Sequence, residues 1–299
     1  MNGRVMEKWV HVRSFASAGS WLTIIRVRSC FSGALLFALG MLSHDGHVPV
    51  TALLFGAGSM WSAVAQINVV NDIADRALDS VDKPWRPLPS GEISLRAATV
   101  SCVVLGIGSV ALGLAAGRVV ALGVGVLIAA SILYSAILKS TVLVGNIVVA
   151  LASTVPFVAG SVEARAVSAV VLIEEGMLTA FMLAFEIVKT TADFTGDGEA
   201  GLSTIAIRWG PDTGLRAGVF AFYVCCAIAL SLVAYAGRVR GMLFGLAFAR
   251  FVVAPVVRCY YGGVVTGGLA HLRARELFRG MQKVWKFGFL CLLLLAYRR

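Results

Sequence analysis

The sequence predicts an all-α protein that crosses a membrane about nine times. Hydrophobic residues make up 59% of the 299 residues and charged residues only 14%, whereas about a quarter of a typical soluble domain is charged. The mean hydropathy is +0.86. The apolar residues form runs of roughly 20, the length that an α-helix needs to cross a bilayer. Since no soluble stretch of domain size separates the runs, we expect one integral-membrane domain over residues 1–299, with a basic cytoplasmic segment at residues 1–20.

The predicted spans follow one another with short polar connections. A proline-rich segment from Lys83 to Gly91 separates the second span from the third, because proline cannot continue a helix. The predicted spans are Trp21–Leu42, Val48–Val70, Ser94–Ala116, Arg118–Leu138, Val142–Gly160, Ala166–Thr190, Asp212–Ala236, Gly241–Tyr260 and Leu277–Tyr297.

Positive charge is distributed unevenly between the two sides of this layout. With the N-terminus in the cytoplasm, the inner segments hold eighteen Lys and Arg residues and the outer segments hold six. Cytoplasmic loops of membrane proteins carry such an excess, so we expect the N-terminus and the inner loops to face the cytoplasm of a cell membrane. This topology accounts for the formal net charge of +10 without a nucleic-acid partner.

Carboxylates gather where the second span reaches the inner side. On a helix that turns about 100° per residue, the polar residues of this segment fall within roughly a quarter of the circumference. They are Asn68, Asn71, Asp72, Asp75, Asp79 and Asp82. Like charges at this spacing repel one another. A divalent cation would convert the repulsion into coordination, and hard oxygen ligands suit Mg²⁺.

A second stripe with the same geometry ends the sixth span. It consists of Glu186, Lys189, Asp193 and Asp197. Solvation is the simpler interpretation of a single acidic pair, but two stripes on one side of the membrane favour a shared metal site. Basic residues accompany both stripes, and such cations neutralise the oxygens of a metal-bound diphosphate.

Two further acids, Glu174 and Glu175, lie elsewhere on the sixth span. They precede Lys189 by about fifteen residues, or about 22 Å at 1.5 Å per residue. We expect them to be solvated at the outer interface; the alternative is a role inside the membrane.

The motifs around the acidic stripes form a recognisable pattern. Asn-Asp-Ile-Ala-Asp-Arg-Ala-Leu-Asp runs over residues 71–79, followed by Arg-Pro-Leu-Pro-Ser-Gly over 86–91. Asp-Phe-Thr-Gly-Asp runs over 193–197, followed by Gly-Leu-Ser-Thr over 201–204. Tyr-Ser-Ala-Ile-Leu-Lys (134–139) and Gly-Asn (145–146) lie between them. Together these segments resemble the UbiA superfamily of intramembrane prenyltransferases, and the similarity covers essentially the whole chain. Members of its archaeal ether-lipid and homogentisate branches often have Lys-Asp where this chain has Lys189-Thr190.

The resemblance implies a helical bundle around a central cavity in which Mg²⁺ assists ionisation of an isoprenoid diphosphate. An acceptor then captures the allylic cation. The residues expected to bind metal and carry catalysis are Asp72, Asp75, Asp79, Asp193 and Asp197. The residues expected to bind diphosphate are Asn71, Arg76, Lys139, Lys189, Tyr134 and Arg86.

Three functions remain open at this point. The first is transfer of a C10–C20 or longer prenyl group to a small aromatic or lipid-alcohol acceptor. The second is a terpene cyclase that uses the same metal site on the prenyl diphosphate alone. The third, a carrier, is disfavoured because its ionisable groups would lie near the membrane midplane. Aromatic residues, which stabilise the cations of a cyclase, make up only 9% of the chain, so we favour transfer.

Overall fold

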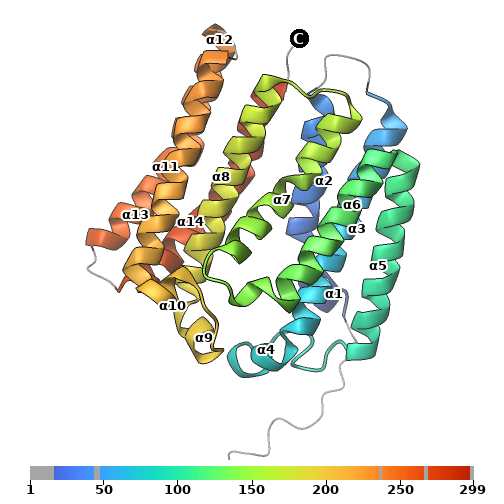
Figure 1. The fold of residues 1–299 in the computed structure, drawn as a ribbon, viewed down its shortest axis with the longest axis vertical. Coiled ribbons are helices and arrows are strands. Elements are labelled where there is room, and N and C mark those ends of the chain that lie inside the picture. Colours follow the sequence, from blue (N-terminus) through green and yellow to red (C-terminus); the bar gives the residue numbers. More distant parts are fainter. Residues whose placement is uncertain (1–16, 44–47, 236–237, 266–268, 297–299) are drawn as a thin grey trace, which may run out of the picture.

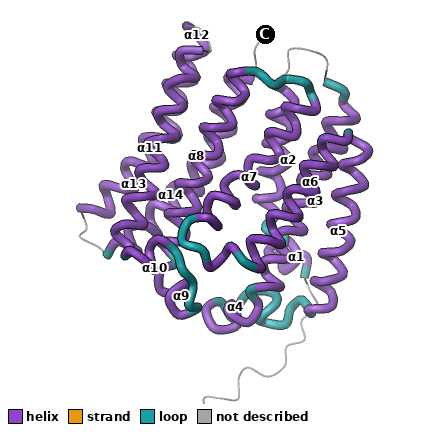
Figure 2. The backbone as a smooth tube through the Cα atoms, viewed as in Figure 1, coloured by secondary structure: helices purple, strands orange, loops and turns teal. Residues whose placement is uncertain are grey.

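The computed structural model describes residues 17–43, 48–235, 238–265 and 269–296, and within these ranges the regular structure is entirely helical (Figures 1 and 2). The predicted all-α class is confirmed. Most of the basic segment at residues 1–20 lies outside the described residues. In chain order the elements are α1 (Ala18–Ile24), α2 (Val27–Leu42), α3 (Val50–Ala74), α4 (Arg76–Asp82), α5 (Leu95–Ala116), α6 (Arg118–Ala136), the 3-10 turn η1 (Leu138–Ser140), α7 (Val144–Glu163), α8 (Ala169–Ala192), α9 (Phe194–Glu199), α10 (Ile205–Trp209), α11 (Pro211–Tyr235), α12 (Arg238–Phe248), the π-helical segment η2 (Ala249–Val253), α13 (Ala254–Val265) and α14 (Ala270–Ala296).

Six stretches of the described chain are long and apolar enough to cross a membrane. They are α3, α5, α6, α7, α11 and the stretch Val239–Gly262. The pair α1–α2, bent by 55°, makes a seventh if it is counted as one span. The predicted count of nine is therefore not confirmed. The sixth predicted span corresponds to α8, a long helix that carries Glu174, Glu175, Glu186 and Lys189, and the ninth to α14, whose first half is rich in arginine.

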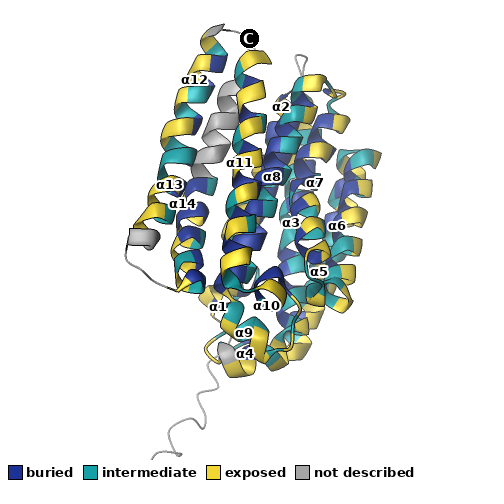
Figure 3. Cartoon of the chain, turned by 60° about the vertical axis from the view of Figure 1, so that its left-hand side comes forward, coloured by how far each residue is buried: buried dark blue, intermediate teal, exposed yellow. Residues whose placement is uncertain are grey.

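The bundle shields its charged helix from lipid. α8 packs against α7, α11 and α14, and its residues Phe181, Ala184 and Val188 belong to the largest apolar core. Exposed side chains instead lie on the outer faces of the bundle (Figure 3), and on α5 these include Val103, Val104 and other apolar residues. An apolar exterior is what a lipid environment requires, so the fold agrees with an integral membrane protein.

Two glycines let α2 and α7 approach each other at backbone distance. A Cβ atom on Gly40 would lie 2.2 Å from the Phe157 carbonyl oxygen, and one on Gly160 would lie 2.2 Å from that of Phe37. Small residues allow such contacts between membrane helices. α2 and α7 thereby join the α3–α5–α6 side of the bundle to the α8–α11–α14 side (Figure 1).

The short helices gather at one end of the bundle. α4, α9 and α10 all lie at the lower end in Figure 1, below the long helices. α3, α6 and α8 also reach this end with their C-termini (Figure 1). The two predicted acidic stripes therefore lie at the same end.

The close contact between α2 and α7 predicts that a Gly→Ala substitution lowers the free energy of unfolding at the contact and does not lower it elsewhere on a helix. Gly40→Ala places a methyl group against the Phe157 carbonyl and should lower the free energy of unfolding by about 1–3 kcal/mol. Gly108→Ala is the control, since a Cβ there meets nothing within 4 Å and alanine favours the helix by up to about 1 kcal/mol. Thermal unfolding in detergent distinguishes the two. Equal melting temperatures of the variants would contradict the close packing.

Candidate active site

Each acidic motif is built around a break between two helices. α3 ends at Ala74 and α4 begins at Arg76, so Asp75 stands at the junction with φ −87° and ψ 2°. Asp193 stands between α8 and α9 with φ −86° and ψ 10°. The backbone N–H of each aspartate still bonds the carbonyl four residues earlier, at 2.9 and 3.0 Å. The expectation of one continuous helical stripe is wrong at both motifs, because the helix is interrupted at Asp75 in the first and at Asp193 in the second.

The turns after the two motifs also correspond. Gly91 has φ +79° and Gly201 has φ +66°, a conformation that glycine adopts without steric strain. Ser94 then caps α5, and Thr204 caps α10 by accepting a hydrogen bond from a backbone N–H. The Gly-Leu-Ser-Thr segment therefore ends the second motif and caps the next helix, whereas after the first motif Gly91 makes the turn and Ser94, three residues later, caps the helix.

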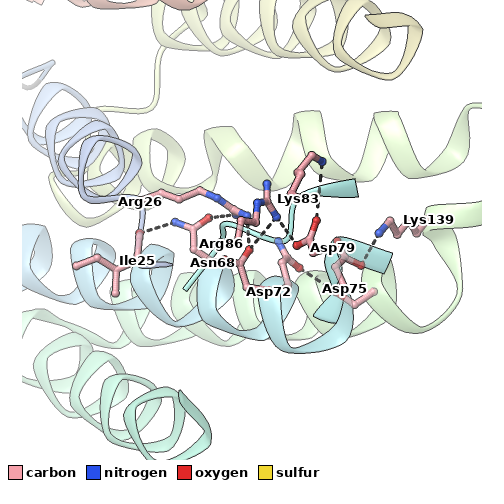
Figure 4. Close-up of polar contacts among 11 residues, drawn as sticks. Ile25, Arg26, Asn68, Asp72, Asp75, Asp79, Lys83, Arg86 and Lys139 are labelled. Carbon is pink, nitrogen blue, oxygen red and sulfur yellow. Dashed lines mark hydrogen bonds and ion pairs between the residues drawn. The ribbon is translucent and has the colours of Figure 1, made fainter. Parts of the chain in front are cut away.

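A chain of ion pairs neutralises the first motif (Figure 4). Asp72 pairs with Arg26 and lies 3.6 Å from Arg86, while Asp79 lies 2.5 Å from Arg86 and 3.9 Å from Lys83. Asp72 and Asp79 are 6% and 3% exposed. Buried carboxylates need such partners, since an unpaired buried charge is strongly destabilising. The predicted repulsion along the stripe is therefore offset by cations.

Arg86 reaches these carboxylates from the turn between α4 and α5. Leu88 and Ile93, on either side of the turn's glycine, are 3% and 1% exposed. They belong to an apolar cluster with Val69 of α3 and Ile24 of α1. The proline-rich turn is thus anchored against α3, which fixes the position of Arg86 next to Asp72 and Asp79.

Arg26 is a site residue that the sequence analysis counted only as an inner positive charge. It lies at the break between α1 and α2 with φ 49°, an uncommon conformation for a residue other than glycine. Its Nη1 donates to Asn68 Oδ1 at 2.9 Å, and Asn68 Nδ2 donates to the Ile25 carbonyl at 2.8 Å. The available signal was an arginine inside an apolar span, which usually marks a polar partner.

The end of α6 supplies two further contacts to the first motif. Lys139 of η1 pairs with Asp75, and the Ser135 hydroxyl donates to Asn71 Oδ1 at 2.9 Å. Tyr134 lies within electrostatic range of charged residues of both motifs, namely Asp75 of the first and Lys189, Glu186 and Asp197 of the second.

The second motif has a smaller set of partners. Lys189 lies 3.0 Å from buried Glu186, and Asn146 of α7 donates to the Thr190 hydroxyl at 3.4 Å. Arg275 of α14 donates to the carbonyl of Ala192, the last residue of α8, at 3.0 Å. Asp193 is exposed, and no ion pair to it is found within the described ranges.

Asp197 connects the two motifs electrostatically. Burial, and next the negative charge of Asp193, raise the pKa of Asp197 to about 6, while Lys139, Lys189 and Lys83 act in the opposite direction. Lys83 and Lys139 are the same residues that pair with the first motif. Residues more than a hundred positions apart therefore share one site.

Arg76 is the one predicted diphosphate ligand that the fold leaves apart. Its side chain is exposed on α4, and in the described part of the chain it forms no ion pair. Its assignment stays a prediction.

The donor chemistry of the site fits Mg²⁺ only in part. The aspartates offer the hard oxygen ligands that this ion prefers, and Asp72 lies within electrostatic range of Asp75 and Asp79. No three Asp, Glu, His or Cys side chains converge as a metal cage among the residues described. Mg²⁺ is commonly held by one or two carboxylates plus substrate phosphates, and the aspartates Asp72, Asp75, Asp79, Asp193 and Asp197 suit that arrangement.

Glu174 and Glu175 lie inside the bundle. Glu174 is only 2% exposed. Glu175 Oε1 accepts hydrogen bonds from Thr154 of α7 at 2.5 Å and from Thr179 at 3.2 Å. Solvation at the outer interface is therefore wrong for Glu174, and Glu175 forms part of a polar contact between α7 and α8.

The raised pKa of Asp197 predicts a pH dependence of stability. Its ionised form is disfavoured in the folded protein, so the penalty is absent below about pH 3.8, the ordinary value, and complete above about pH 6. Asp197→Asn should therefore gain stability relative to the wild type as the pH rises through this window, by about 1 kcal/mol after a discount for solvent screening. Thermal unfolding with EDTA from pH 4 to 7 measures the difference. If the melting temperatures of the wild type and Asp197→Asn changed in parallel with pH, the raised pKa of Asp197 would be contradicted.

Comparisons with known proteins agree with this fold. Residues 32–263 match the model of the UbiA prenyltransferase family. The digeranylgeranylglyceryl phosphate synthase of Korarchaeum cryptofilum (strain OPF8) is 29% identical over 77% of this chain and 81% of its own length. That of Halobacterium salinarum (strain ATCC 29341 / DSM 671 / R1) is 34% identical over 77% of this chain and 83% of its own length. The structure of a UbiA homolog from Archaeoglobus fulgidus bound to DMAPP and Mg²⁺ superposes with a TM-score of 0.69, at 18% identity, over 92% of this chain and 99% of that one. The family match covers most of the chain, and the chain belongs to the UbiA prenyltransferase family.

Proposed function

We propose that this protein transfers a prenyl group from an isoprenoid diphosphate to the hydroxyl group of a glycerophosphate-type lipid, in a reaction that depends on Mg²⁺ and releases diphosphate. The observation that carries the proposal is that both acidic motifs lie at the same end of the bundle (Figure 1) with cations among their carboxylates: Arg86 and Lys139 pair with the first motif, and Lys189 pairs with Glu186 beside the second. Carboxylates and cations interleaved in this way suit a metal-bound diphosphate.

The residues of the site have distinct roles in this reaction. The C–O bond between the prenyl carbon and the diphosphate breaks, and the acceptor oxygen forms a new bond to that carbon as it loses its proton. Mg²⁺, held by aspartates of both motifs, would neutralise the charge that develops on the leaving group. Lys139, Lys189 and Arg86 add fixed positive charge near the diphosphate, where preorganised groups stabilise a transition state. Asn71 and Tyr134 orient these groups, and the apolar bundle keeps water from the reacting carbon.

A phosphorylated acceptor suits both the relatives and the charge of this end of the bundle. The relatives are named for a product with two geranylgeranyl chains on glyceryl phosphate. Arg275, whose Nε atom donates to the Ala192 carbonyl, lies beside the second motif and adds positive charge there. A lipid phosphate would be attracted to such a surface. The aromatic acceptor, the other class considered from the sequence, has no comparable support.

The cyclase alternative gains one observation. Phe181 and Phe185 of α8 lie 5.2 and 4.9 Å, between ring centroids, from Trp285 and Phe278 of α14. Aromatic residues near α8 are therefore more numerous than the composition suggested. They pack against one another within the apolar core, so transfer remains the proposed function.

Product analysis tests the function directly. Protein in nanodiscs is incubated with labelled geranylgeranyl diphosphate and one acceptor: geranylgeranylglyceryl phosphate, the corresponding unphosphorylated alcohol, an aromatic acid, or none. Of the four conditions, we expect product only with the phosphorylated lipid, and we expect EDTA to abolish this turnover. A cyclic product formed without an acceptor would establish the cyclase instead.

Substitution of the second motif separates catalysis from stability. Asp193→Asn should lower kcat by about 100-fold or more with a melting temperature that is unchanged or higher, because Asp193 is exposed and its negative charge opposes that of Asp197. Asp72→Asn should lower both, because Arg26 and Arg86 lose a buried partner. Asp212→Asn is the control at the same end, since Asp212 is exposed and forms an ion pair with Arg273, away from the acidic motifs. Normal activity of Asp193→Asn would exclude it from the metal site.

We further propose that this end of the bundle faces the cytoplasm, as the excess of basic residues indicates. In a background without the six native cysteines, Ser80→Cys and Ser203→Cys, both at exposed positions, should react with an impermeant thiol reagent in inside-out vesicles only. Val167→Cys, 58% exposed at position 167 in the α7–α8 loop at the opposite end (Figure 1), should react in right-side-out vesicles only. The reverse pattern would invert the topology.

A further inference from the structure

The carboxylates of the first motif are already bonded to cations of the protein. Asp72 pairs with Arg26, Asp75 with Lys139 and Asp79 with Arg86. These partners come from the α1–α2 break, the end of α6 and the α4–α5 turn, so the pairs are contacts of the tertiary structure. A metal ion that binds these oxygens must compete with each cation.

Competition with these cations weakens the binding of a metal ion when no diphosphate is bound with it. Arg86 and Lys139 have side chains only 28% and 24% exposed. If a metal took their carboxylates, both cations would lose their partners in a partly desolvated site, which is unfavourable. A diphosphate removes this penalty, since its oxygens are good partners for Arg and Lys.

The number of converging acids leads to the same conclusion. Within the described residues, no three potential metal ligands come together. An ion held here by one or two carboxylates completes its coordination with water or with phosphate oxygens, and the diphosphate of the proposed function supplies the phosphate oxygens.

The charge of the site is nearly balanced. Six carboxylates (Asp72, Asp75, Asp79, Glu186, Asp193 and Asp197) face six cations (Arg26, Lys83, Arg86, Lys139, Lys189 and Arg275). Two divalent ions alone would leave the site strongly positive, whereas a trianionic prenyl diphosphate bound together with them removes most of that charge.

We infer that this protein binds the metal and the diphosphate as one chelate, and that Arg86 and Lys139 exchange their aspartate partners for diphosphate oxygens when it binds. This inference rests on the proposed function, because it takes an isoprenoid diphosphate as the ligand. On this view Arg86 and Lys139 are substrate-binding residues that have two successive partners. The metal and the diphosphate then promote each other's binding by the same factor.

Binding measurements with Lys139→Met test the exchange without turnover. Mn²⁺ is the metal probe, followed by electron paramagnetic resonance, and methylenediphosphonate is the diphosphate probe, with its own affinity for Mn²⁺ in solution subtracted. In the wild type we expect the diphosphonate to tighten Mn²⁺ binding by about tenfold or more. In Lys139→Met, Mn²⁺ alone should bind about threefold or more tightly, because Asp75 has lost its competitor. The Mn²⁺–diphosphonate chelate should bind about tenfold or more weakly.

Two further variants make the result decisive. Arg86→Met should show the same two changes as Lys139→Met: tighter binding of Mn²⁺ alone and weaker binding of the Mn²⁺–diphosphonate chelate. Thermal unfolding checks that each variant is folded. Arg279→Met is the control, since Arg279 pairs with Glu276 on the exposed face of α14, and both affinities should stay at wild-type values.

A single outcome overturns the inference: Mn²⁺ alone binding the folded Lys139→Met and Arg86→Met variants as weakly as, or more weakly than, the wild type. That result would make the cations supports of a preloaded metal site. Failure of the proposed function is distinguishable, because it would be seen as absent prenyl transfer by a wild type that still binds the chelate.

Discussion

The structure depends on the neutralisation of carboxylates at the ends of apolar helices. Asp72 and Asp79 are buried where α3 and α4 meet, and each would be strongly destabilising without a cation. Their partners, Arg26 and Arg86, lie on separate segments. The bend between α1 and α2 and the turn after α4 therefore have to take the positions that bring these cations to α3. The same ion pairs that stabilise this end of the bundle supply the charges that a diphosphate site requires.

The rest of the bundle places the second motif against the first. Gly40 and Gly160 allow α2 and α7 to pack at backbone distance, and α7 in turn packs on α8. The polar contact from Asn146 to Thr190 lies at the end of this interface. By the resemblance noted in the sequence, Thr190 stands where the archaeal ether-lipid and homogentisate branches often have an aspartate, and here its hydroxyl group is bonded within the protein. Asp193 and Asp197 remain as the carboxylates of the second motif.

Much of this could be predicted from the sequence, for identifiable reasons. Hydropathy predicts long apolar helices because a bilayer requires them, and the acidic motifs predict the site because their residues are close in the chain. The breaks at Asp75 and Asp193 were not predictable, since neither glycine nor proline stands at these positions. The role of Arg26 was not predicted because its partner, Asp72, is 46 residues away in the sequence. The burial of Glu174 depends on how α8 packs against its neighbours, which periodicity does not show.

The central claim is that the two motifs bind one metal–diphosphate group. Anomalous diffraction from crystals grown with Mn²⁺ and an unreactive prenyl thiodiphosphate tests it most directly. We expect Mn²⁺ peaks at the diphosphate, between Asp75 and Asp193, with no more than two carboxylates on each ion and with Arg86 and Lys139 bonded to diphosphate oxygens. Peaks at one motif alone, or an ion held by three or more carboxylates away from the diphosphate, would contradict it.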